Sequence, residues 1–126
     1  MNSITYFEIQ ASEPANAAGF YKNVFGWEFR KEEFQPVEYW RMHEASGIFG
    51  AILKRPAPAP APGSGTNAFT CSVEVDSFDQ TAQKILDNGG RVALPKFAVP
   101  GRCWQGYFLD IDNNAFGIFE ADTNAK

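Results

Sequence analysis

The stretch ITYFEIQASEPANAAGFYKNVFGW (residues 4–27) decides the fold, because TCSVEVDSFDQTAQKILDNGG (residues 70–90) repeats its plan. In both stretches an alternating, strand-like segment leads into a helical pattern that ends at glycine. Ile9 of the first stretch corresponds to Val75 of the second, which lies 66 residues further on. Three more strand-like segments follow each copy. The sequence therefore predicts a duplicated module of one strand, one helix and three strands, written βαβββ.

The two predicted modules span residues 3–54 and 68–121, and a proline-rich linker over residues 55–67 separates them. The alternation of alanine and proline in this linker favours a stiff polyproline II spacer. At 126 residues the chain has the length of one domain. Since neither module is long enough to bury an adequate core alone, we expect the two to close on each other in a single α+β domain over residues 1–126.

The helices are predicted at residues 13–25 and 77–88 from their apolar spacing. Gly26 suits the end of the first helix, because glycine adopts the left-handed conformation at little cost. Ser77 and Gln80 have the spacing of a capping box at the start of the second helix. Strands are predicted over residues 4–10, 27–33, 38–43, 48–54, 68–75, 91–98, 102–110 and 115–121.

Composition excludes several classes of protein. The net charge of −4 argues against a nucleic-acid partner, which calls for a basic surface. No apolar stretch approaches the roughly 20 residues of a membrane span, and the first residues lead directly into a strand pattern, so we expect neither a membrane segment nor a signal peptide. Cys71 and Cys103 lie in strand-like segments and are expected to be buried thiols. These features predict a soluble, cytoplasmic protein.

Several short segments resemble the vicinal oxygen chelate superfamily, which includes glyoxalase I, bleomycin-resistance proteins and extradiol dioxygenases: residues 7–9, 18–21, 24–27, 106–110 and 114–120. The resemblance implies curled mixed sheets that enclose a cavity, and a homodimer. The family's usual D-P-x-G-N ending is altered here, since Ile111 replaces the proline and Asn113 the glycine. Asparagine also accepts positive φ, so we expect the turn to be kept.

The resemblance also implies up to four positions that supply metal ligands, which fall on Ile4, Gly50, Thr70 and Gly117. None of these is a usual ligand of a divalent ion, which needs several carboxylate, imidazole or thiolate donors together. We therefore predict that the inherited metal site is lost and that no cofactor is bound. The small residues Gly50 and Gly117 would leave room in the cavity for a ligand.

Strand alternation places Tyr6 and Glu8 on one face, with Phe7 on the other, and in the family frame the Tyr6 side lines the cavity. A carboxylate in this position is either a general acid or base or simply a solvated group on the cavity wall. The predicted ligand is an uncharged or cationic aromatic molecule that stacks on Trp104 or Phe119 and approaches Glu8. The predicted ligand-binding residues are Tyr6, Glu8, Ser72, Glu74, Trp104 and Phe119.

The leading functional hypothesis is a glyoxalase/bleomycin-resistance-like protein that binds a small molecule without metal, and whether it is an enzyme stays open. The alternative is a metal-dependent lyase, isomerase or dioxygenase, similar to lactoylglutathione lyase, with a new metal site. A third alternative is a structural dimer whose cavity has collapsed around aromatic residues. The only histidine is either a ligand of such a site or a surface residue. The candidate ligands of the new site are Glu8, His43, Glu74 and Glu120.

Overall fold

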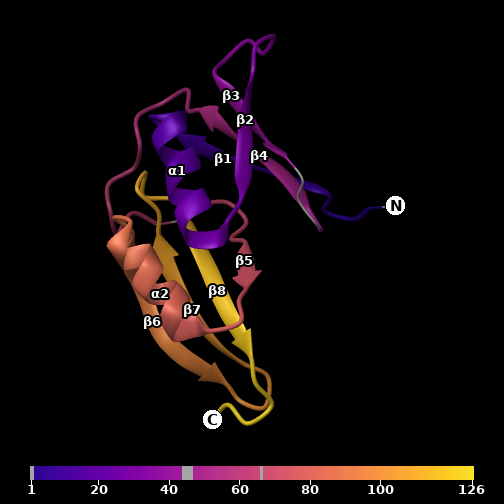
Figure 1. Cartoon of the computed structure of the whole chain (residues 1–126). Helices are drawn as coiled ribbons and strands as arrows, with labels where there is room; N and C mark the ends of the chain where they lie inside the picture. Colours follow the sequence, from indigo (N-terminus) through magenta and orange to yellow (C-terminus); the bar gives the residue numbers. More distant parts are fainter. Residues whose placement is uncertain (1, 44–46, 66) are drawn as a thin grey trace. The chain divides into compact units, whose positions relative to one another are not determined.

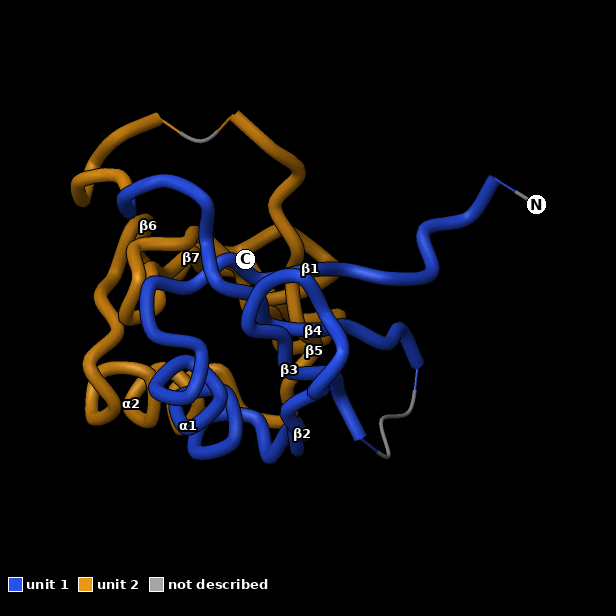
Figure 2. Tube along the Cα trace, turned by 90° about the horizontal axis from the view of Figure 1, so that it is seen from above, with its two compact units in different colours: residues 1–59 blue, residues 60–126 orange. Residues whose placement is uncertain are grey.

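A computed structural model describes residues 2–43, 47–65 and 67–126 (Figure 1). The chain forms two compact units, Met1–Ala59 and Pro60–Lys126, and their boundary falls within the predicted linker (Figure 2). Each unit contains one helix and a four-stranded mixed sheet. The predicted α+β class and the duplicated βαβββ order are therefore confirmed. No helix in the described ranges is long and apolar enough to cross a membrane.

The elements follow the predicted order in both units. The first unit consists of β1 (Tyr6–Ala11), α1 (Pro14–Phe25), β2 (Glu28–Glu32), β3 (Tyr39–His43) and β4 (Phe49–Lys54). The second unit consists of β5 (Ser72–Glu74), α2 (Phe78–Asp87), β6 (Arg91–Val99), β7 (Cys103–Leu109) and β8 (Ala115–Ala121).

The first sheet has the order β1-β4-β3-β2, with β1 parallel to β4 and the other neighbours antiparallel. Phe7 lies on the face that α1 covers, since its ring centroid is 5.8 Å from that of Trp27, which stacks on Tyr21 of α1. Tyr6 and Glu8 alternate with Phe7 and so lie on the opposite face. We call this opposite face of the first sheet the Tyr6 face.

The second sheet repeats this plan with the order β5-β8-β7-β6, and β5 runs parallel to β8. Phe108 lies on the face that α2 covers, with its ring centroid 6.1 Å from that of Phe78. Ser72 and Glu74 pair with Gly117 and Phe119 in the register of the sheet. This second set lies on the face turned away from α2, which we call the Ser72 face.

The helix boundaries have the causes that the sequence indicates. Gly26 ends α1 with a φ of 77°, and its N–H donates to the carbonyl of Lys22. Ser77 begins α2, and its hydroxyl accepts a hydrogen bond from the backbone N–H of Gln80. Asn113 takes a φ of 64° in the turn between β7 and β8, so the turn is kept without glycine.

Two local predictions were wrong. β5 spans three residues, whereas a strand over residues 68–75 was predicted. In the parallel register Ser72 pairs with Gly117, so Thr70 falls level with Ala115, the first residue of β8. The residues that precede Thr70 therefore have no strand beside them with which to pair. Cys71 lies directly before β5 and is exposed, which corrects the expectation of a buried thiol, and Cys103 is half-buried; both are free.

Candidate functional site

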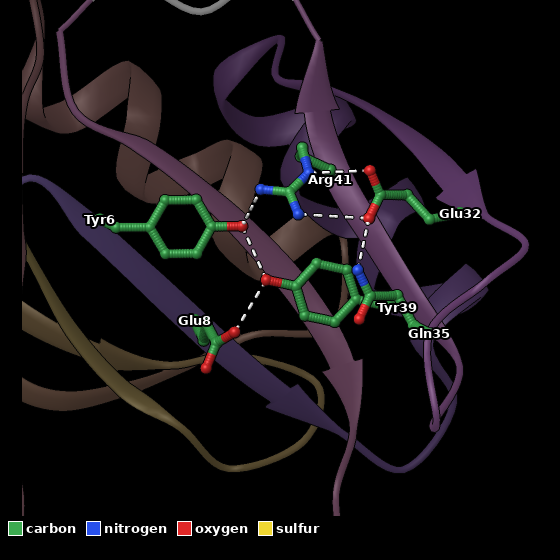
Figure 3. A network of polar contacts seen from close by, with 6 residues as sticks. All are labelled: Tyr6, Glu8, Glu32, Gln35, Tyr39 and Arg41. Carbon is green, nitrogen blue, oxygen red and sulfur yellow. Dashed lines mark hydrogen bonds and ion pairs between the residues drawn. The ribbon is translucent and has the colours of Figure 1, made fainter.

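A connected network of polar side chains lies on the Tyr6 face (Figure 3). It draws on three strands and the segment after β2, and the sheet order brings these residues together although they are far apart in the sequence. Its members are Tyr6, Glu8, Glu32, Gln35, Tyr39 and Arg41. The sequence predicted only Tyr6 and Glu8 of this set.

The central part of the network is a chain of hydrogen bonds. Arg41 Nη1 donates to the Tyr6 hydroxyl at 2.8 Å, the two tyrosine oxygens are 2.7 Å apart, and Tyr39 donates to Glu8 Oε2 at 2.8 Å. A hydroxyl has one proton to donate. Since the Tyr39 proton goes to Glu8, the proton between the phenols belongs to Tyr6. Every bond therefore points from Arg41 toward Glu8.

Arg41 is held at its other end by Glu32. Its Nε donates to Glu32 Oε2 at 2.8 Å and its Nη2 donates to Oε1 at 3.2 Å, a bidentate pair, while Gln35 Nε2 donates to Oε1 at 2.9 Å. The bonds from Arg41 and then Gln35 hold the pKa of Glu32 below its usual range. The bond with Glu32 in turn raises the pKa of Arg41. The guanidinium charge is thus committed to Glu32.

Tyr39 is the buried member of this hydrogen-bonded network, with 7% of its surface exposed. Burial, followed by its hydrogen bonds with Tyr6 and Glu8, raises the pKa of Tyr39 well above the usual range of a phenol. Its hydroxyl therefore keeps its proton and remains a donor to Glu8. Glu8 itself is exposed, and Tyr39 is its one hydrogen-bond partner among the described residues.

The Ser72 face gathers three of the predicted residues. Ser72 and Glu74 are exposed on β5, and Phe119 is half-buried beside them on β8. Gln105 of β7 lies opposite Phe119, is 9% exposed, and donates through Nε2 to the Ser72 hydroxyl at 3.2 Å. Gln105 was not predicted, although counting outward from the β7–β8 turn would have paired it with Phe119.

Trp104 does not share this face, which corrects the prediction that Trp104 and Phe119 both line the ligand site. It pairs with Glu120, its Nε1 donates to Asp122 Oδ2 at 3.0 Å, and Lys96 Nζ lies 4.9 Å from its ring centroid. Because neighbours along a strand point to opposite faces, Trp104 and Gln105 cannot both lie beside Phe119.

Glu120 lies on the same side as α2. Its Oε1 accepts a hydrogen bond of 2.7 Å from the backbone N–H of Phe78, the first residue of that helix. Glu120 therefore stabilises the start of α2 and lies on the opposite face from Glu74. His43 is at the end of β3, opposite Glu28 of β2. Among the described residues, no group of three or more His, Cys, Asp and Glu side chains is arranged to hold a metal ion.

The four positions at which the family supplies metal ligands are placed as follows. Ile4 and Thr70 precede β1 and β5 and are exposed. Gly50 lies on the face that α1 covers, where a Cβ atom would collide with the ring of Phe7. Gly117 lies on the Ser72 face, where a Cβ atom would be 2.7 Å from Gln105 Nε2 and would also collide with the Ser72 hydroxyl. The expectation that Gly50 and Gly117 leave room for a ligand was therefore wrong, because other side chains fill both positions.

Comparisons with known proteins agree with this architecture. The fosfomycin resistance protein FosX from Listeria monocytogenes is similar in structure, with a TM-score of 0.75 and 14% identity over 97% of this chain and 94% of that one. A glyoxalase/bleomycin resistance protein/dioxygenase family enzyme from Burkholderia phytofirmans PsJN gives a TM-score of 0.72 and 15% identity over 95% and 99%. TioX from Micromonospora sp. ML1 gives 0.67 and 14% over 96% and 100%. At these identities the likeness shows the fold alone.

No curated protein sequence matches the chain. The family model of the glyoxalase/bleomycin resistance protein/dioxygenase superfamily, however, matches residues 3–118. This range includes all of the first βαβββ unit and the second unit up to the first four residues of β8, so the resemblance read from the sequence is confirmed. The chain therefore belongs to the glyoxalase/bleomycin resistance protein/dioxygenase superfamily.

Proposed function

We propose that this protein binds a small molecule on the Tyr6 face, through Glu8 and Tyr6, without a divalent metal ion. The observation that carries the proposal is the chain of hydrogen bonds that ends on the exposed carboxylate of Glu8. The hydrogen bond from Tyr39 fixes one carboxylate oxygen of Glu8 and leaves the other oxygen for a ligand. Groups that are held in place before binding lose less entropy when the ligand arrives.

The donors on this face suit a small molecule better than a metal ion. Tyr39 keeps its proton, Arg41 is a cation, and Glu32 is paired with Arg41, so Glu8 is the network's one carboxylate without a cationic partner. A single carboxylate is too few anionic donors for a divalent ion in a protein site. In a catalytic version of this proposal, Glu8 is the general acid or base.

A screen of the purified chain tests the proposal. Thermal shift is measured with a panel of small aromatic compounds, with EDTA and separately with Mn²⁺, and bound metal is measured by elemental analysis. We expect compounds that stabilise the protein equally with and without EDTA. The variant Glu8→Gln should lose the shift, whereas Glu33→Gln, an exposed glutamate outside the network, should keep it.

A FosX structure contains Mn(II) and 1S,2S-dihydroxypropylphosphonic acid, which is why Mn²⁺ is the metal in the test. Ligand binding that requires Mn²⁺, or stoichiometric metal in the purified protein, would overturn the metal-free proposal and favour a metal-dependent lyase, isomerase or dioxygenase. Binding that survives Glu8→Gln unchanged would overturn the placement of the site.

We also propose that the chain forms a homodimer. Several large apolar side chains are exposed on both units, including Phe34, Phe49, Phe69 and Leu94. Large apolar side chains are usually buried, and a second copy of the chain could cover those that are exposed here. Light scattering should give twice the 14.0 kDa mass of one chain, and a monomer at high concentration would contradict the proposal.

A further inference from the structure

We infer that the ligand of the Tyr6 face presents a protonated amine, or a similar cationic N–H donor, to Glu8. This inference rests on the proposed function and adds the chemical class of the ligand to it. It follows from two independent properties of the network, its charge and the direction of its hydrogen bonds.

The first property is charge. Arg41 contributes one formal positive charge, and Glu32 and Glu8 contribute one negative charge each. The positive charge is neutralised by the bidentate pair between Arg41 and Glu32, so the network carries a net formal charge of −1 and this charge resides on Glu8. An anionic ligand would be repelled here, whereas a cation would gain the attraction of a carboxylate without a cationic partner among the described residues.

The second property is direction. The hydroxyl protons of Tyr6 and Tyr39 are both used in hydrogen bonds inside the network, and the carboxylate of Glu8 can only accept hydrogen bonds. Arg41 uses three N–H groups on Glu32 and Tyr6, and its guanidinium carbon lies 5.6 and 5.4 Å from the ring centroids of Tyr6 and Tyr39. At Glu8 the face therefore offers acceptor positions and no hydroxyl donor. A ligand that supplies N–H donors fits this pattern.

Tyr39 is the positioning residue of this site. It does not need to touch the ligand, because its hydroxyl fixes one oxygen of Glu8 at 2.8 Å and so sets the direction of the other. A hydrogen bond to an ionised group is among the stronger ones in proteins. Without this hydrogen bond, the carboxylate of Glu8 would rotate freely. The affinity of the site for a cation would then fall more than its affinity for a neutral molecule.

The test uses three probes that share one ring system: 1-naphthylmethylammonium, 1-naphthalenemethanol and 1-naphthoate. Dissociation constants are measured by NMR titration of the full-length protein at pH 7 in low and in high salt. We expect the ammonium probe to bind roughly tenfold more tightly than the alcohol and the carboxylate to bind weakest. The preference for the ammonium should shrink in high salt, because screening weakens charge attraction.

Single-residue variants test which side chains cause the preference for the ammonium probe. Glu8→Gln should abolish the difference between ammonium and alcohol, and Glu33→Gln should keep it. Tyr39→Phe should reduce the ratio of the two affinities several-fold, a readout that general loss of stability would not change. If the fold of Tyr39→Phe is impaired, as shown by circular dichroism, Glu8→Gln decides the case alone.

The outcomes separate the two proposals. Equal or tighter binding of the alcohol or the carboxylate, lost in Glu8→Gln, would overturn the inference about charge and leave the proposed function standing. A failure of all three probes, together with no hit in the wider aromatic screen, would overturn both.

Discussion

Tyr39 reaches across a whole strand to bond with Glu8: its hydroxyl lies 2.8 Å from Glu8 Oε2, although β4 separates β3 from β1 in the sheet. Ala51 of β4 pairs with Glu8 on one side and with Arg41 on the other, while Tyr39 pairs with Leu53, two residues further along β4. The methyl group of Ala51 leaves space above β4 for longer side chains. The network therefore depends on a small residue that takes no part in its hydrogen bonds.

The variant Tyr39→Phe should lower the free energy of unfolding by about 1–2 kcal/mol, because it removes the donor to Glu8 and the acceptor for Tyr6 in one change. Urea denaturation followed by circular dichroism measures the effect. Tyr107→Phe is the matched control, since the Tyr107 hydroxyl has no hydrogen-bond partner among the described residues. Equal losses in the two variants would show that the Tyr39 hydroxyl contributes nothing through this network.

Ala51→Leu should disrupt the network without touching any of its polar atoms. Ala51 is fully buried, so a leucine would have to occupy the space that Tyr39 and Arg41 cross. Overpacking of this kind typically costs about 1–3 kcal/mol. The melting temperature should fall and the binding of the ammonium probe should weaken. Ala15→Leu, on the exposed side of α1, should change neither, and normal probe binding by Ala51→Leu would contradict the role given to Ala51.

Substitution by alanine should change the stability of the protein in opposite directions at two glycines of the first unit. Gly19 lies within α1 with open space around it, so Gly19→Ala should stabilise the protein by about 1 kcal/mol through the better helix propensity of alanine. Gly50→Ala should destabilise it, because the new Cβ would meet the ring of Phe7. Thermal unfolding of both variants checks the pair. A neutral Gly50→Ala would mean that the Phe7 ring moves aside at no cost.

The architecture was readable from the sequence because its signals are local. Strand alternation placed Tyr6 and Glu8 opposite Phe7, and Gly26 and Ser77 marked helix ends, each within a few residues of the feature it explains. The shortness of β5 was not readable, because the ends of an edge strand depend on its pairing with a strand distant in the sequence, here β8.

Most of the network could not be predicted, since it depends on lateral strand order. Tyr39 and Arg41 are more than thirty residues from Tyr6, and only the order β1-β4-β3 and the register through Ala51 bring them close. The error at Trp104 was of another kind. Alternation alone allows either of two neighbours on β7 to lie beside Phe119, and the register across the turn selects Gln105.

The pairing of Arg41 with Glu32 should make stability depend on pH in the acid range. The pKa of Glu32 is lowered in the folded protein, chiefly by the hydrogen bonds from Arg41. A carboxyl with a depressed folded pKa contributes stability above its unfolded pKa, and this contribution is lost as pH falls through the folded value. The wild type should therefore lose more stability between pH 6 and about pH 3 than Glu32→Gln does. Urea midpoints measured at several pH values compare the two, with Glu33→Gln as the exposed control that should follow the wild type. Parallel pH profiles for the wild type and Glu32→Gln would show that the ion pair does not persist in solution.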